Sequence, residues 1–258
     1  MEISPNKISK EIIDLKASFL WPVDMVRYGI QIDPSMEYFR SREGLLQEEE
    51  LKRRIETSKK KIEHARKFLW VWERIPWVKM VLITGSVASM NALPEHDIDF
   101  WVICDPRRIW LTRLFDWVLL SLSGVRRRRG TKKLRDTFCV NFYKTTDNLS
   151  LWVHNASYAI QVADAIVIMQ EPGLYKKLLR SNSWLKEYLP AWYEKTMSEN
   201  ERVPDYEGNP QDFIAKWVNN IEYLVGSIQI MIRDRKFVWP RPSDVFSNEM
   251  NTWGDSEA

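Results

Sequence analysis

The sequence has few of the residues that characterise two common classes of protein. It contains 2 cysteines and 3 histidines in 258 residues. Cys104 and Cys139 lie in predicted core strands and are too few for a disulfide framework, which indicates buried free thiols in a reducing compartment. The histidines, His64, His96 and His154, are too scattered along the chain to form the usual zinc-binding set. These absences argue against a disulfide-rich secreted domain and against a zinc module.

Long hydrophobic runs and targeting signals are also lacking. The longest apolar stretch, 109–125, contains Arg113 and Asp116 and is too short to span a bilayer. Residues 1–7 lack the basic and apolar regions of a signal peptide. We therefore expect a cytoplasmic protein without a membrane partner. The sequence also lacks a Walker loop, a dinucleotide-binding fingerprint and a serine-nucleophile elbow.

Positive charge is concentrated locally, because the net charge of the whole chain is only +3. A helix predicted over 48–75 has an apolar face and a basic one, the latter comprising Arg53, Arg54, Lys59, Lys60, Lys61, Arg66 and Lys67. A second basic cluster lies in a predicted loop and comprises Arg126, Arg127, Arg128, Arg129, Lys132 and Lys133. Each cluster is either a solvated surface or a contact for RNA, DNA or polyphosphate.

The most informative stretch runs from Val78 to Cys104. Two apolar runs, 78–83 and 97–104, have the composition of strands buried on both faces. The first run ends in Thr84-Gly85-Ser86 and is followed by a short predicted helix over 87–92. Gly85 permits a sharp turn and a close approach by a ligand, and the helix start would face an anion.

Two carboxylates interrupt the second run. Asp97 and Asp99 point to the same face of the strand, because side chains alternate along it. Burying unpaired carboxylates is costly, so the pair requires an explanation. A hard divalent cation, Mg²⁺ or Mn²⁺, is the partner that such a pair suits.

A strand, Gly-Ser, a short helix and then Asp-x-Asp on the next strand together resemble the DNA polymerase beta-like nucleotidyltransferase superfamily, including an uncharacterised prokaryotic group with this domain. The resemblance covers about residues 40–245. It implies an α+β protein with an α/β-type core, in which a small mixed sheet packs on helices and a C-terminal helical region follows. It also implies that Gly85 and Ser86 hold the phosphates of a nucleotide such as ATP, and that Asp97 and Asp99 are the catalytic, metal-binding pair.

The third predicted strand, 137–143, departs from the pattern of that superfamily. The superfamily usually has a third carboxylate here, and the matching position is Asn141, expected on the same face as Cys139 and Tyr143. Asparagine can offer a metal its carbonyl oxygen but has no charge and cannot act as a general base. Asp136, just before the strand, is a weaker candidate for the missing carboxylate.

The predicted organisation has three parts. Residues 1–45 form an N-terminal accessory segment, 46–150 the nucleotidyltransferase core, and 151–258 a C-terminal helical region with a polar tail. Within the last part, helices are predicted over 155–170, 174–180, 184–189 and 211–235, with a polar linker over 199–210. The final helix has apolar residues at helical spacing, namely Phe213, Trp217, Ile221, Leu224, Ile228 and Met231.

Two functions follow as expectations. The first is a magnesium-dependent nucleotidyltransferase that transfers a nucleoside monophosphate from a nucleoside triphosphate to an acceptor hydroxyl. The acceptor stays open between a nucleic-acid end, a protein side chain and a small molecule. The second is a catalytically inactive nucleotide- or nucleic-acid-binding regulatory module on the same fold, in which Asn141 has removed the chemistry.

Overall fold

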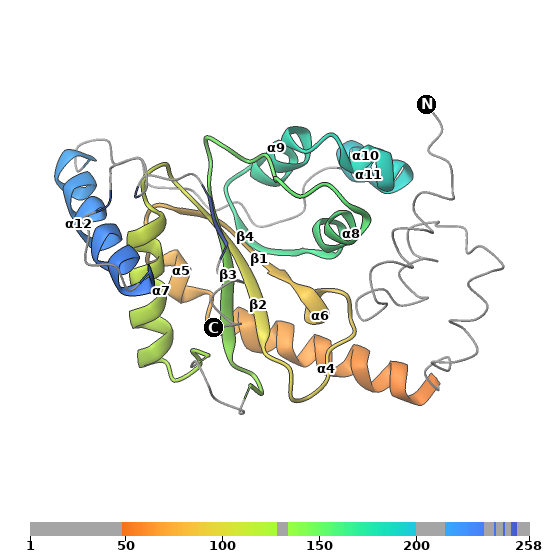
Figure 1. The fold of residues 1–258 in the computed structure, drawn as a ribbon. Helices are drawn as coiled ribbons and strands as arrows, with labels where there is room; N and C mark the ends of the chain where they lie inside the picture. Colours follow the sequence, from red (N-terminus) through yellow and green to blue (C-terminus); the bar gives the residue numbers. More distant parts are fainter. Residues whose placement is uncertain are drawn as a thin grey trace.

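The computed structural model describes residues 48–127, 134–199 and 215–234, together with 240, 245 and 249–251. The accessory segment 1–45, the loop residues 128–133 and nearly all of the predicted linker lie outside the described residues. In chain order the elements are α4 Glu48–Lys67, α5 Trp70–Glu73, β1 Val78–Thr84, α6 Gly85–Ala88, β2 Ile98–Cys104, α7 Ile109–Leu122, β3 Phe138–Thr145, α8 Ala156–Asp164, β4 Ile166–Gln170, α9 Leu174–Ser181, α10 Leu185–Tyr188, α11 Pro190–Ser198, α12 Ala215–Asp234 and β5 Glu249–Asn251 (Figure 1).

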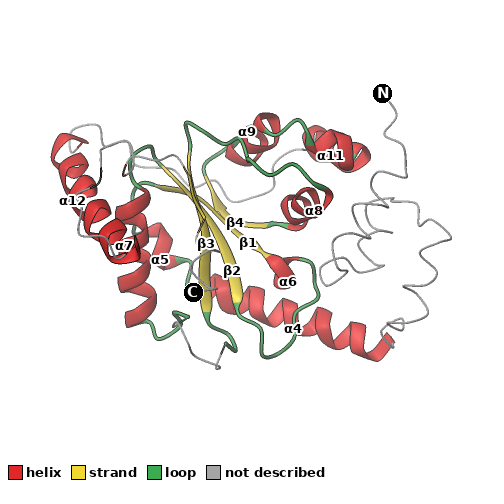
Figure 2. Cartoon of the chain, in the orientation of Figure 1, coloured by secondary structure: helices red, strands yellow, loops and turns green. Residues whose placement is uncertain are grey.

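The predicted α+β class is confirmed, with helices on both sides of one twisted mixed sheet (Figure 2). The strand order is β4-β1-β2-β3-β5. Only β2 and β3 run parallel, and the other neighbours are antiparallel. The three strands predicted from the sequence are adjacent in this sheet, as expected. Their nearly continuous β-branched and aromatic composition explains why they were recognisable, since the central strands are buried on both faces.

The single helix predicted over 155–170 is wrong in its second half. Helix α8 ends at Asp164, and β4 then pairs antiparallel with β1. Ile166-Val167-Ile168 is a β-branched run of the kind that favours strands. The pairing with β1, more than 80 residues earlier in the chain, overrides the helical pattern that the apolar spacing suggested. The sheet thus includes strands from beyond residue 150.

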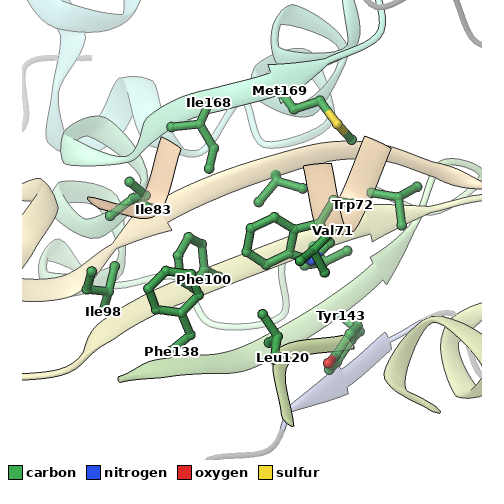
Figure 3. Packing of buried hydrophobic residues seen from close by; sticks show 14 of the residues in the cluster. Val71, Trp72, Ile83, Ile98, Phe100, Leu120, Phe138, Tyr143, Ile168 and Met169 are labelled. Carbon is green, nitrogen blue, oxygen red and sulfur yellow. The ribbon is translucent and has the colours of Figure 1, made fainter. Parts of the chain in front are cut away.

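Each face of the sheet has its own hydrophobic cluster. Side chains that alternate along β2 divide between them: Ile98, Phe100 and Val102 pack with α4, α5 and α7. Trp101 and Ile103 instead pack with α8, α9, α10 and α11. Figure 3 shows the first cluster, where Trp72, Phe100 and Phe138 lie together. Rings at centroid distances of 4.8 to 6.5 Å join these three residues.

Several helix predictions need correction in detail. The helix predicted over 48–75 is divided into α4 and α5 by a turn at residues 68–69. Pro190 was expected to end a helix, but it begins α11, where a residue without an N–H group is well tolerated. The sequence also predicts a helix over 107–122 with Trp110, Leu114, Trp117 and Val118 facing inward. In α7, however, the exposed fraction of Trp117 is 52 %. Among the described residues, no helix is both long and apolar enough to cross a bilayer.

Four of the apolar residues of the final helix are exposed. Trp217 is 80 % exposed, and Ile221, Leu224 and Ile228 are also exposed among the described residues. Helix α12 packs on α7 through a different set of side chains. The carboxylate of Glu222 accepts hydrogen bonds from the backbone N–H groups of Trp110 and Leu111 at the start of α7. A buried polar contact at a helix start decides the rotation of α12, because those N–H groups lack partners within α7.

Candidate functional site

Three segments of the chain meet at one end of the central strands, where β1 ends and β2 and β3 begin. Thr84, the last residue of β1, pairs with Asp99 of β2. On the other side, Asp99 pairs with Cys139 of β3. Since paired residues of neighbouring strands place their side chains on the same face, the carboxylate and the thiol lie next to each other. The Gly-Ser turn follows Thr84 directly and therefore lies beside the same carboxylate.

Gly85 lies against Asp99 more closely than any other residue type would allow. Its backbone has a φ of +65°, and a Cβ atom added to it would lie 2.8 Å from Oδ2 of Asp99. A side chain would therefore meet both an unfavourable backbone conformation and the carboxylate. The structure places the Gly-Ser turn next to Asp99, as predicted. Helix α6 is a single turn, so backbone N–H groups, rather than a long helix dipole, are what the turn offers an anion.

From the sequence, His96 could be either a phosphate contact or a plain loop residue, and the structure places its side chain against this turn. Its Nδ1 lies 3.0 Å from Oγ of Ser86 and 3.3 Å from the backbone nitrogen of Leu93. A backbone N–H group can only donate, so Nδ1 is the unprotonated nitrogen and the ring carries its hydrogen on Nε2. Ser86 consequently donates its hydroxyl hydrogen to His96. The Nε2–H group is a further donor beside the Gly-Ser turn.

Lys61 holds this loop in place. Its ammonium group, buried at 2 % exposure, donates to the backbone oxygens of Pro94 and His96 and to Oδ1 of Asp136. The lysine predicted on a solvated or nucleic-acid-facing surface is thus a buried structural donor. The ion pair with Lys61 lowers the pKa of Asp136 despite its partial burial. Asp136 is therefore engaged elsewhere and is outside the acidic cluster found in the described part of the chain.

The carboxylates of Asp97 and Asp99 and the thiol of Cys139 form a cluster that could hold a metal ion. One ligand atom of each lies within 4.8 Å of the other two. Asp97 comes just before β2 rather than inside it. Burial, followed by the negative charge of Asp97, raises the pKa of Asp99 to about 7. Burial and the same two carboxylates raise the pKa of the Cys139 thiol to about 11. A cation would relieve this accumulation of negative charge.

Asn141 reaches the cluster through an irregularity in β3. Phe100 pairs with Val140 and Trp101 pairs with Phe142, so Asn141 is an extra residue without a partner on β2. Its Nδ2 donates to Oδ1 of Asp99 at 2.9 Å. Its Oδ1 is buried and has no hydrogen-bond partner among the described residues.

The extra residue at Asn141 forms a β-bulge, and it places Tyr143 on the opposite face from the one predicted. This residue lies in the cluster on the α7 side and donates its hydroxyl to Asp116 of α7. The extra residue reverses the alternation after Asn141, so Tyr143 is not on the face of the candidate site. Sequence spacing alone assumes an uninterrupted strand and cannot reveal this reversal.

Arg127 supplies the positive charge at the cluster. Its Nη1 lies 2.7 Å from Oδ2 of Asp97 and 3.8 Å from Sγ of Cys139. The arginine reaches this position because its backbone N–H donates to the carbonyl oxygen of Phe138 at the start of β3. The guanidinium of Arg126 lies instead over the ring of Trp117 on α7. Arg128, Arg129, Lys132 and Lys133, predicted to contact phosphate or nucleic acid, lie outside the described residues.

The residues present could hold a metal ion. Two carboxylates and a thiol converge, the buried amide oxygen of Asn141 lacks a partner, and a guanidinium already lies on one carboxylate. Sequence reasoning missed Cys139 and the specific contact of Arg127. The pairing of Cys139 with Asp99 could have been suspected from their equivalent places at the starts of two strands. The parallel register that pairs them, however, is known only from the folded structure.

Comparison of the chain with protein-family models, with curated proteins and with solved structures gives no match.

Proposed function

We propose that the protein is a nucleotidyltransferase that transfers a nucleoside monophosphate from a nucleoside triphosphate such as ATP to an acceptor hydroxyl. The observation that carries the proposal is the contact of the Gly85 backbone with the carboxylate of Asp99, with Asp97 beside it. A glycine turn that can approach phosphate and a carboxylate pair that can hold a cation are the two parts that phosphoryl-group chemistry requires. In this protein the glycine turn lies directly beside the carboxylate pair.

Each residue has a defined part in the proposed reaction. The backbone at Gly85 and Ser86, with the Nε2–H of His96, binds the β- and γ-phosphates. Asp97 and Asp99 hold Mg²⁺ or Mn²⁺, which when bound polarises the phosphates and lowers the pKa of the acceptor hydroxyl. The acceptor oxygen bonds to the α-phosphorus, the bond from that phosphorus to the bridging oxygen breaks, and pyrophosphate leaves. The proton of the acceptor passes to a carboxylate of the pair, because Asn141 cannot accept it.

The direct test is incubation with each labelled nucleoside triphosphate, Mg²⁺ or Mn²⁺, and total cellular RNA or protein, followed by separation of labelled products. We expect incorporated label and released pyrophosphate, both abolished when Asp97 and Asp99 are changed to asparagine. A protein that binds a triphosphate but labels none of these acceptors and no small hydroxyl compound would contradict the proposal.

A second candidate is favoured by two contacts at the cluster. Asn141 stands at the third position and bonds to Asp99, while Arg127 neutralises Asp97. A site neutralised in this way suits a catalytically inactive module that binds a nucleotide or nucleic acid. The substitution Asn141→Asp separates the two candidates. A working enzyme should gain activity or change its preference between Mg²⁺ and Mn²⁺, whereas a binding module should stay inactive and lose stability from the added buried charge.

A further inference from the structure

The thiol of Cys139 occupies the place in the cluster where a third ligand would stand. It is paired with Asp99 across the parallel ladder, and its sulfur lies within 4.8 Å of the ligand oxygens of Asp97 and Asp99. Ligands bound to one ion at about 2.0–2.6 Å are separated by distances of this order. The sulfur can therefore bind the same ion as the carboxylates without a movement of the backbone.

Arg127 marks the position of a cation between the oxygen and sulfur ligands. Its Nη1 contacts both Oδ2 of Asp97 and Sγ of Cys139. The side chain of Arg127 is 36 % exposed, so it has room to leave when another cation arrives. The two groups that the guanidinium contacts are two of the three that could bind a metal ion.

Asn141 is an independent indication of a ligand. Its side chain is buried at 6 % exposure, and its Nδ2 is fixed by the hydrogen bond to Asp99. Its Oδ1 has no partner among the described residues, and a buried carbonyl oxygen without a partner is costly. A cation held by Asp99 is a natural partner for this oxygen, because amide oxygens are common metal ligands.

We propose that Asp97, Asp99 and Cys139 together bind a divalent transition-metal ion with mixed oxygen and sulfur ligands, such as Co²⁺ or Zn²⁺, in preference to Mg²⁺. Magnesium binds almost exclusively to oxygen, whereas these transition metals accept thiolate as well as carboxylate. The thiol releases its proton to solvent when it binds the ion. The inference deepens the proposed function, since it concerns the metal of the same site.

The test uses Co²⁺ alone as the probe, because a cobalt–thiolate bond produces a charge-transfer absorption that oxygen ligands do not. Titration of the full chain should produce this band, and Cys139→Ser should abolish it and weaken Co²⁺ binding at least tenfold. Cys104→Ala is the matched control, since Cys104 is the other cysteine and is buried in the sheet away from the carboxylates. This control should keep the band.

A second variant guards against a folding defect in Cys139→Ser. Asp97→Asn leaves the thiol in place, so it should weaken Co²⁺ binding while the remaining bound ion still gives the band. An excess of Mg²⁺ should displace Co²⁺ poorly from the unaltered protein. Absence of the band in the unaltered protein, or a band that Cys139→Ser retains, would overturn the inference.

The outcomes separate this inference from the proposed function. Nucleotide transfer with Mg²⁺, together with Co²⁺ binding that lacks a thiolate band, would overturn the metal assignment and leave the transferase. A thiolate band without transfer of any nucleotide would support the metal assignment and remove the transferase. Transfer that is faster with Co²⁺ than with Mg²⁺, and loses this preference in Cys139→Ser, would support both.

Discussion

Asp99, which is partly buried, and Asp116, which is fully buried, both have a raised pKa, but their surroundings differ. Burial raises the pKa of each carboxyl to about 7. Asp116 is a buried residue of α7, and the hydroxyl of Tyr143 in β3 donates to it. Asp99 lies at a strand edge beside a second carboxylate, a thiol and an amide, with a glycine turn against its oxygen. A raised pKa alone therefore does not mark a functional site, whereas convergence of several ligand groups does.

The largest expected difference between the two aspartates is in nucleotide transfer. Asp99→Asn should lower the rate roughly a thousandfold or more, because it removes a metal ligand from the proposed site. Asp116→Asn preserves shape and keeps an acceptor for the Tyr143 hydroxyl, so it should leave the rate near that of the unaltered protein. Labelled-nucleotide incorporation measures both. Equal losses of transfer rate in the two variants would mean that each substitution acts through reduced stability and not through the chemistry of the site.

The second largest effect concerns stability at Asp116. Its pKa in the folded protein, about 7, lies above its ordinary value of 3.8, so the folded state binds the proton more tightly than the unfolded state. The contribution of Asp116 to stability is present below pH 4 and is lost as the pH rises toward 7. Between pH 5 and pH 8 the unaltered protein should lose roughly 2–3 kcal/mol more than Asp116→Asn in urea unfolding.

Asp147→Asn, in an exposed turn, is the control for that measurement. It should follow the unaltered protein at both pH values. A pH dependence that persists unchanged in Asp116→Asn would mean that other groups are responsible. Glu222 is the first of these to consider, because burial raises its pKa to about 7 although it accepts two backbone hydrogen bonds.

A smaller effect should separate two glycines that share a backbone conformation. Gly85 and Gly124 have φ values of +65° and +73°, but only at Gly85 would a Cβ meet another atom within 4 Å, the Asp99 carboxylate being first. Gly124→Ala should cost about 1 kcal/mol from backbone strain alone. Gly85→Ala should cost roughly 1–2 kcal/mol more and weaken metal binding, because Asp99 must move. Equal unfolding free energies would show that the contact is easily relieved.

The smallest effect concerns the guanidinium at the cluster. Arg127→Gln should tighten Co²⁺ binding by roughly fivefold, since the metal no longer displaces a partly exposed ion pair worth about 1 kcal/mol. Tyr143→Phe, which alters the surroundings of Asp116 on the other face, should leave Co²⁺ affinity unchanged. Isothermal titration calorimetry measures both. Weaker binding in Arg127→Gln would mean that the arginine assists the metal instead of competing with it.

Patterns within single segments of the sequence were enough to predict the three central strands and the closeness of the Gly-Ser turn to the aspartates. These features rest on short-range signals: continuous apolar runs, a glycine at a strand end and side-chain alternation. Alternation is a local property, so it correctly placed Asp99 on one face and Ile98 and Phe100 on the other. The α+β class was expected from the resemblance that these segments have, taken together, to a known superfamily.

The other residues that meet Asp99 could be identified only from the three-dimensional fold. The parallel register brings Cys139 beside it, and the bulge brings Asn141 to the same carboxylate while turning Tyr143 to the opposite face. Arg127 reaches Asp97 across 30 residues of chain, and β4 joins the sheet by pairing with β1. Register, bulges and long-range pairing depend on the fit of segments distant in the chain. No pattern within one segment specifies them, because each is decided by the packing of the partner as much as by the segment itself.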